Sequence, residues 1–398
     1  MKNRYLLACA SVLLLAMNTP ADPAMLSPAD VTLTAAEKAE LKTGLQPERW
    51  FVERLRGPRE RVDGQRLDAK LQFLKEMAAA QKPENEDDLL AAFDTPKKRA
   101  AIRADTDRRW TIRAAITADM AVEDRTVPGR GGPVPVRIYR PETGEDGPLP
   151  VLVYYHGGGF VFASVRAVDR QVRLIANAAH VIVVSVDYRL APEHPFPAPQ
   201  DDAEDAFLWA RAHAASLGGD PARIGVGGDS AGGHLALVTS LRQRAAGRPG
   251  PLYQLLYYPA VTLDQGDRSY ALFGEGYGLD LAFINVVTRL AFPDPASREA
   301  PATWALRESS LAGMPATIVA TAGYDPLRDQ GRRLAARLET DGVGVVYLNY
   351  PSLTHSFLNW SGLIPDANRA ARETAALFGQ AIRSRAVAAA DTDRRGGE

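Results

Sequence analysis

The chain has 398 residues, of which 46% are hydrophobic and 24% are charged, and its formal net charge is -1. This size and balance fit one large globular α/β domain with additions, or two smaller domains. The near-neutral charge gives no electrostatic reason to expect nucleic acid or an anionic membrane as a partner. The single cysteine, Cys9, excludes an internal disulfide framework and a thiolate metal cluster.

The first residues have the layout of a secretory signal. A basic start precedes an apolar run over 6–16, and small residues lead to a cleavage site after Ala21. The run is shorter than the ~20 residues that a membrane-spanning helix needs, so no integral membrane span is expected. We therefore predict a signal peptide over 1–21 and export to the periplasm or the medium. The alternative is a cytoplasmic protein that starts at Met17 or Met25.

Residues 22–121 predict helices and linkers without strand-like alternation. Thr34 and Glu37 have the spacing of a capping box, and Thr95 precedes a proline suited to the first helical position, Pro96. The helices are amphipathic, so their apolar faces need a surface to cover. We predict a helical cap or extension that lies over the following domain. The alternative is an independent module or a dimer arm.

Residues 122–386 alternate between short apolar runs and amphipathic helical patterns. This alternation predicts an α/β domain with a mostly parallel central sheet flanked by helices. A segment over 264–312, rich in glycine, proline and aromatic residues, interrupts the pattern, and we expect it to close over the strand ends as part of the cap. Residues 387–398 are predicted to form a disordered tail. The apolar runs are VPVRIYRP, PLPVLVYY, VIVVSVDY, RIGVGG, YQLLYYP, ATIVATAG and VGVVYLNYP.

One serine stands between glycines where a strand-like run meets a helix-like run. The stretch Gly228-Asp229-Ser230-Ala231-Gly232 has the G-x-S-x-G pattern of a sharp strand-to-helix turn that exposes a nucleophilic hydroxyl. Side chains at the two outer positions would collide with neighbouring backbone in such a turn. A phosphate-binding loop fits less well, because Ser230 stands where a dinucleotide fingerprint needs its third glycine.

A serine hydroxyl needs a base, and the base needs an orienting acid. In α/β hydrolases these follow the serine in the order acid, then histidine. His355, directly after the last strand-like run, is the only histidine beyond the helix that carries Ser230. Asp325 lies just past the preceding strand and is the predicted acid, with Asp329 as the alternative about one turn later.

A second glycine-rich stretch, His156-Gly157-Gly158-Gly159, follows another strand-like run. Backbone N–H groups in such an HGGG-type loop can donate to a developing oxyanion. We predict an oxyanion hole from Gly157, Gly158, Gly159 and Ala231, in which the N–H groups of the last three donate. His156 is predicted to brace the loop.

No metal or cofactor site is predicted. The other histidines, His180, His194, His213 and His234, are assigned structural roles, since no pair has metal-ligand spacing and no H-E-x-x-H occurs.

Several stretches together resemble the bacterial hormone-sensitive-lipase-like (family IV) carboxylesterases: HGGGF, DYRLAPEHPFPA, GDSAGG, AGYDPLRDQG and a final His-x-Phe. The similarity extends over about 122–384. It implies an α/β-hydrolase fold, a cap partly built from the N-terminus, and cofactor-independent hydrolysis of short- to medium-chain acyl esters by Ser230, Asp325 and His355. The sequence departs from the family at Ser356, where glycine usually follows the histidine, and in its longer N-terminal helical region.

The expected function is therefore that of a serine carboxylic-ester hydrolase acting on a small-molecule ester. The same groups would also serve a lactone, amide or carbamate hydrolase. A non-catalytic ligand-binding relative is a further alternative, although a binder has no need of His355. Monomer and homodimer both stay open.

Overall fold

The structure is a computed structural model that describes residues 32–79, 85–144, 147–299 and 303–395. The predicted signal peptide over 1–21 lies outside these residues. Among the helices described, none is both long enough and apolar enough to pass through a bilayer.

Eight strands of the described chain form the central sheet: β3 (Ala121–Val127), β4 (Val134–Arg140), β5 (Leu149–Tyr155), β6 (Ile182–Val186), β7 (Gly219–Asp229), β8 (Tyr253–Tyr257), β9 (Ala316–Tyr324) and β10 (Val345–Thr354). Their spatial order is β10-β9-β8-β7-β5-β6-β4-β3. Pairing is parallel from β10 to β6, and β4 pairs antiparallel with β6 and β3. The predicted α/β fold with a mostly parallel sheet is confirmed.

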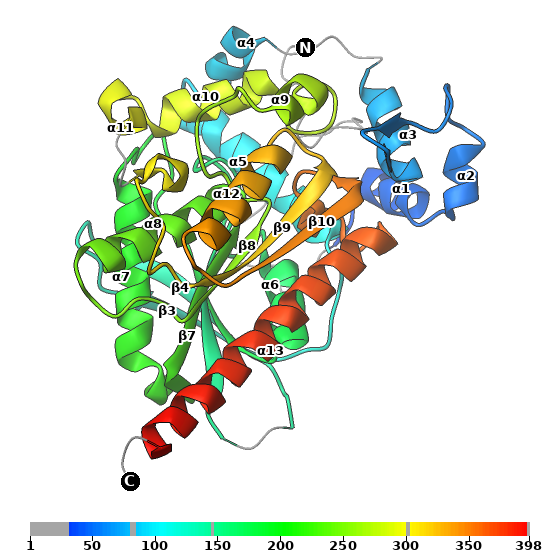
Figure 1. Cartoon of the computed structure of the whole chain (residues 1–398). Helices are drawn as coiled ribbons and strands as arrows, with labels where there is room; N and C mark the ends of the chain where they lie inside the picture. Colours follow the sequence, from blue (N-terminus) through cyan, green and yellow to red (C-terminus); the bar gives the residue numbers. More distant parts are fainter. Residues whose placement is uncertain (1–31, 80–84, 145–146, 300–302, 396–398) are drawn as a thin grey trace.

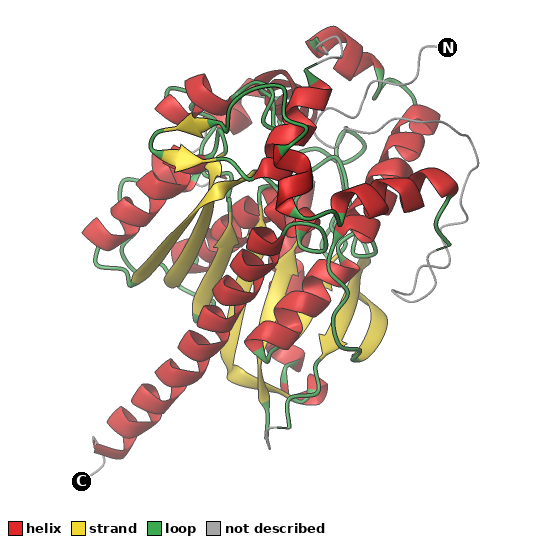
Figure 2. Cartoon of the chain, turned by 90° about the vertical axis from the view of Figure 1, so that its right-hand side faces the viewer, coloured by secondary structure: helices red, strands yellow, loops and turns green. Residues whose placement is uncertain are grey.

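Helices cover both faces of the sheet (Figure 2). One face carries α6 (Asp169–Ala179) and α13 (Pro365–Arg395), and the other carries α7 (Ala198–His213), α8 (Ala231–Ala245) and α12 (Arg328–Thr340). Because both faces are covered, β5, β6 and β9 are buried along their whole length. This explains why their sequences are continuous apolar runs rather than alternating ones.

Further helices gather at the end of the sheet where the parallel strands finish (Figure 1). They are α4 (Glu86–Ala91), α5 (Pro96–Arg113), α9 (Arg268–Phe273), α10 (Leu281–Ala291) and α11 (Pro295–Glu299). Helix α10, from the interrupting segment, packs on α4, from the N-terminal region. Short 3-10 turns complete the chain: η1 (Ala215–Leu217), η3 (Ala305–Arg307) and η4 (Phe357–Trp360).

The N-terminal region begins with α1 (Ala35–Gly44), α2 (Glu48–Val52) and α3 (Ala69–Ala78). The Thr34 hydroxyl and the Glu37 carboxylate form the predicted capping box at the start of α1. The Thr95 hydroxyl accepts from Lys98 N–H at the start of α5, with Pro96 in the first turn, also as predicted.

The prediction that this region has no strand is wrong at one place. A hairpin of two-residue strands, β1 (Arg61–Val62) and β2 (Gln65–Arg66), lies between α2 and α3. Asp63 and Gly64 form its turn with φ of 54° and 75°, values that a two-residue hairpin turn requires.

Residues 387–395 of the predicted tail also differ from the prediction, because α13 continues to Arg395; residues 396–398 lie outside the described residues. The stretch AVAAADTDRR is rich in alanine and has no helix breaker, so the helix continues through it.

We expect Leu152→Ala to lower the free energy of unfolding by about 2–5 kcal/mol, because Leu152 is fully buried in a central strand and alanine leaves a cavity. Chemical denaturation measures this change. Leu45→Ala is the matched control, since Leu45 is 66% exposed, and it should change stability by less than about 0.5 kcal/mol. Equal effects of the two substitutions would contradict the placement of Leu152.

Candidate active site

Ser230 stands at the turn between β7 and α8 in a conformation unusual for a residue with a side chain. Its φ is 53° and its ψ is -117°. A Cβ atom on Gly228 would collide with the backbone of Gly232, and one on Gly232 would collide with the Tyr155 carbonyl. The turn therefore needs glycine at both positions, as the sequence predicts, and it leaves the Ser230 side chain half-buried.

The structure brings together the three side chains predicted to act together. His355 Nε2 lies 2.9 Å from Ser230 Oγ, and His355 Nδ1 lies 2.8 Å from Asp325 Oδ2. The Asp325 carboxylate is fully buried, and its other oxygen accepts from Leu327 N–H at 2.8 Å. Such a chain of contacts can move a proton from the hydroxyl to the imidazole, with the carboxylate orienting the ring.

Asp329, the alternative acid, lies in a different set of contacts. It forms an ion pair with Arg328 at 2.9 Å and accepts from Ser269 N–H at 3.0 Å. The contact with the imidazole is made by Asp325, the preferred candidate.

The loop that carries His355 contains the departure from the family pattern noted above. Ser356 has φ of 59° and ψ of 33°, the left-handed conformation that favours glycine. Serine thus adopts at this position the backbone conformation that glycine adopts most readily. The imidazole ring also packs against the Tyr258 ring in a T-shaped arrangement, at 4.8 Å between ring centroids.

The glycine-rich loop after β5 contains two of the predicted oxyanion donors. Within the described part of the chain, the N–H groups of Gly158, Gly159 and Ala231 have no hydrogen-bond acceptor. Gly157 must be removed from the predicted set, because its N–H already donates to Asp229 Oδ1 at 2.8 Å.

Asp229, which the sequence analysis did not single out, joins the serine turn to this loop. Besides Gly157 N–H, its Oδ1 accepts from the Tyr154 hydroxyl at 2.9 Å. Burial raises the pKa of the Asp229 carboxyl, while these two hydrogen bonds favour its charged form. The G-x-S-x-G pattern gives no signal for this role, since its second position accepts any residue.

Residues of the N-terminal region and of the interrupting segment cover the loop. The Phe162 ring meets Phe93 edge-on at 5.3 Å and stacks on Phe283 of α10 at 5.6 Å. The Val287 side chain of α10 lies against Gly159, within 3.1 Å of where a Cβ would stand. The N-terminal region and the interrupting segment therefore meet directly over the glycine loop.

Helix α5 holds the continuation of the same loop by polar contacts. Arg103 Nε donates to the Val161 carbonyl at 2.9 Å, and the Ser164 hydroxyl donates to Asp107 at 2.8 Å. The second carboxylate oxygen of Asp107 is buried without a partner in the described structure.

Two buried histidines have the structural surroundings predicted for them. The His156 ring stacks on Tyr188 at 4.3 Å, and burial lowers its pKa. His234 packs against Trp304 at 4.4 Å, and burial, with Arg242 nearby, lowers its pKa to about 3. Both rings are therefore neutral near pH 7, and in the described structure the imidazole hydrogen-bonded to Ser230 Oγ is that of His355.

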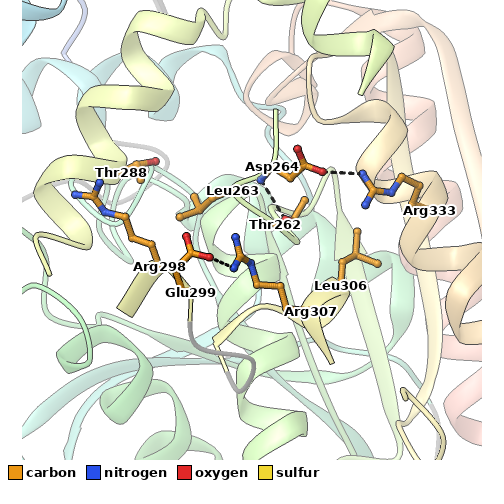
Figure 3. Close-up of a pocket in the computed structure, with 9 residues that line it drawn as sticks. All are labelled: Thr262, Leu263, Asp264, Thr288, Arg298, Glu299, Leu306, Arg307 and Arg333. Carbon is orange, nitrogen blue, oxygen red and sulfur yellow. Dashed lines mark hydrogen bonds and ion pairs between the residues drawn. The ribbon is translucent and has the colours of Figure 1, made fainter. Parts of the chain in front are cut away.

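A cavity of about 540 Å³ lies between the interrupting segment and α12 (Figure 3). It is lined by Thr262, Leu263, Asp264, Thr288, Arg298, Glu299, Leu306, Arg307 and Arg333. Arg307 is paired with Glu299, and Arg333 with Asp264. Two of the three arginines are thus paired with carboxylates, and Arg298 Nε donates to the Phe292 carbonyl at 2.6 Å. Because Ser230 is not in the lining, we assign no ligand to this cavity.

Comparison with known proteins agrees with this geometry. Residues 152–359 match the family model described as an alpha/beta hydrolase fold. Carboxylic ester hydrolase LipN of Mycobacterium tuberculosis is 39% identical over 75% of this chain and 78% of its own length. Esterase LipI of the same organism is 40% identical over 65% of this chain and 81% of its own.

Solved structures give the same result. A hyperthermophilic esterase from the archaeon Pyrobaculum calidifontis has a TM-score of 0.67 and 38% identity, covering 71% of this chain and 93% of that one. An ester hydrolase from the metagenome of Lake Arreo, complexed with a derivative of bipyridine phosphonate, has a TM-score of 0.71 and 36% identity, covering 78% and 96%.

The fold and these matches define a serine hydrolase of the carboxylesterase type. The chain belongs to the α/β-hydrolase carboxylesterases, and its resemblance to the hormone-sensitive-lipase-like (family IV) enzymes is confirmed.

Asp107 provides a prediction on pH and stability. Burial raises its pKa to about 6, with Asp187 adding to the increase, while Ser164 and Arg103 act in the opposite direction. Because folding raises this pKa, the folded protein binds the Asp107 proton more tightly than the unfolded chain does. The free energy of unfolding that Asp107 contributes is therefore present while the carboxyl is protonated and is lost as the pH rises through about 6. We expect Asp107→Asn to increase the free energy of unfolding above pH 7 by up to about 3 kcal/mol.

This gain should diminish as the pH falls from 6 towards 4, which urea denaturation at several pH values measures. Asp105→Asn, on the same helix but with a side chain 43% exposed, is the control and should give no comparable gain. A gain for Asp107→Asn that is constant across this range would contradict the prediction.

Proposed function

We propose that this carboxylesterase hydrolyses short- to medium-chain acyl esters with a Ser-His-Asp triad and a backbone oxyanion hole. The proposed triad is Ser230, His355 and Asp325, and the proposed oxyanion donors are the N–H groups of Gly158, Gly159 and Ala231. The observation that carries the proposal is the continuous contact from hydroxyl to imidazole to buried carboxylate, at 2.9 and 2.8 Å.

In the first half of the reaction, His355 Nε2 takes the Ser230 proton while Oγ attacks the ester carbonyl carbon. The carbonyl electron pair moves onto oxygen, which accepts hydrogen bonds from the backbone N–H groups; each such donor lowers the barrier by about 3 kcal/mol. When the intermediate collapses, the bond to the alcohol oxygen breaks. His355 protonates the departing alcohol, and the acyl group stays on Ser230.

In the second half, His355 removes a proton from water as the water oxygen attacks the acyl carbon. The second intermediate expels Ser230 Oγ, which recovers its proton from His355, and the acid leaves. Asp325 keeps the Nδ1–H tautomer in place and stabilises the transient imidazolium without accepting its proton.

The size preference is supported by the side chains that surround the glycine loop. Val287 lies directly against Gly159, and Phe162 is held between Phe93 and Phe283. Apolar side chains this close to the predicted oxyanion donors offer hydrophobic contact to a short- to medium-chain acyl group.

Ser230→Ala should abolish hydrolysis of p-nitrophenyl butyrate, lowering turnover by at least about 10⁴-fold, since nothing replaces the nucleophile. Circular dichroism should show a folded protein. A fluorophosphonate probe should label the wild type at Ser230 and leave the variant unlabelled. Unchanged turnover in the variant, or a folded wild type that does not react with the probe, would contradict the proposal.

Asp325→Asn should lower kcat by about 10⁴-fold, because an amide no longer holds the imidazole in the correct tautomer. Asparagine keeps an oxygen for the Leu327 N–H, so the turn itself should persist. Steady-state kinetics on p-nitrophenyl butyrate measures the effect. Asp329→Asn is the matched control and should lose far less turnover; the reverse ranking would assign the acid to Asp329.

A further inference from the structure

Tyr324 directly precedes Asp325, and its hydroxyl points out of the sheet towards the N-terminal hairpin. The ring is fully buried. Its hydroxyl donates to the Gln65 carbonyl at 2.7 Å and accepts from Val62 N–H at 3.2 Å. The residue before the proposed acid is thus bound on both strands of a hairpin some 260 residues away in the sequence.

Arg328 makes a second connection, from the other side of Asp325. Its guanidinium pairs with Asp63 in the hairpin turn at 3.0 Å and donates to the Gly323 carbonyl at 3.2 Å. The turn over 323–328 is therefore held by the hairpin at both ends, through Tyr324 on the hairpin strands and through Arg328 on Asp63 in the hairpin turn.

The same hairpin reaches the strand that leads to His355. The Gln65 side chain accepts from Asn349 Nδ2 at 2.9 Å. Just beyond the hairpin, Asp68 N–H donates to the Ser352 carbonyl at 2.9 Å, three residues before the imidazole. The hairpin thus joins the ends of β9 and β10, which carry the proposed acid and base.

The interrupting segment contacts both Tyr324 and the start of the hairpin. The Tyr277 ring lies 5.7 Å from the Tyr324 ring, and the Tyr277 hydroxyl bonds to Glu60 at the start of the hairpin. Lys75 pairs with the same carboxylate at 2.8 Å and lies 3.9 Å from the centre of the Tyr277 ring. The hairpin is therefore fixed to the cap as well as to the acid turn.

From these contacts we infer that the hairpin over 61–66 is a positioning element for the proposed acid, and that Tyr324 is the positioning residue through which it acts. The inference rests on the proposed function, since it assigns a catalytic consequence to the placement of Asp325. Orientation of reacting groups is steeply sensitive to position, and a displacement of about 1 Å can lower a rate by about 100-fold. None of the hydrogen bonds and ion pairs described for the hairpin residues reaches Ser230 or His355, so the effect of the hairpin passes through the acid turn and the end of β10.

The test compares kcat and KM of Tyr324→Phe and Asp63→Asn with those of the wild type on p-nitrophenyl butyrate. Phenylalanine keeps the buried ring and removes only the hydroxyl, whereas Asp63→Asn weakens the pair with Arg328 from the hairpin side. A fluorophosphonate titration carried to completion gives the concentration of active sites, and kcat is calculated from that concentration. Unfolded protein therefore does not lower the kcat obtained. We expect kcat of Tyr324→Phe to fall by roughly 10-fold with KM within about twofold, and Asp63→Asn to act in the same direction.

Tyr139→Phe is the matched control. Tyr139 is a fully buried tyrosine on β4, near the opposite edge of the sheet, and its hydroxyl donates to Asp169 at 2.9 Å. This variant should lose stability but keep the wild-type kcat. Equal losses of kcat in Tyr324→Phe and Tyr139→Phe would make the effect a general one and overturn the inference.

Two further outcomes separate this inference from the proposed function. If Ser230→Ala is inactive while Tyr324→Phe and Asp63→Asn both keep the wild-type kcat, only the positioning role is overturned. If the wild type neither hydrolyses the ester nor reacts with the fluorophosphonate, the proposed function is overturned, and this inference with it. Asp63→Asn also decides the matter if Tyr324→Phe fails to fold, because it changes only a side chain in the hairpin turn.

Discussion

The backbone of Ser230 adopts a conformation that costs a residue with a side chain about 1–3 kcal/mol, so the surrounding structure has to stabilise it. The stabilising contacts are mostly backbone ones. Ser230 N–H donates to the Tyr257 carbonyl at 2.9 Å, and the Ser230 carbonyl accepts from Ala260 N–H at 3.1 Å. Close packing of Gly232 on the Tyr155 carbonyl fixes the other side. The hydroxyl is thus presented by β5, β7 and β8 together, and the rest of the site is arranged around it.

Parallel pairing explains why groups far apart in the sequence converge on this hydroxyl. The carboxyl ends of the parallel strands from β5 to β10 lie at the same end of the sheet. The loops after β5, β7, β9 and β10 each supply one part of the site. The glycine loop, Ser230, Asp325 and His355 follow these strands in that order. Helices on both faces exclude water from the strands, so the loops rest on a rigid base.

Features encoded by neighbouring residues could be predicted from the sequence, such as the caps at Thr34 and Thr95 and the serine turn. The bond that removes Gly157 from the donor set depends on a carboxylate 72 residues away, for which the glycine pattern carries no signal. The hairpin over 61–66 was missed for a related reason. Its strands are two residues long and mostly polar, so they show no apolar alternation, and tertiary contacts hold them in place.

The N-terminal region contacts both halves of the site through separate elements. Helix α5 holds the glycine loop through Arg103 and Asp107, while the hairpin holds the acid turn through Tyr324 and Arg328. Each of these contacts stabilises the docked N-terminal region only when the loop that it touches is in the observed position. Docking of the N-terminal region and the geometry of the loops therefore stabilise each other, since a shift in either one breaks the same hydrogen bonds.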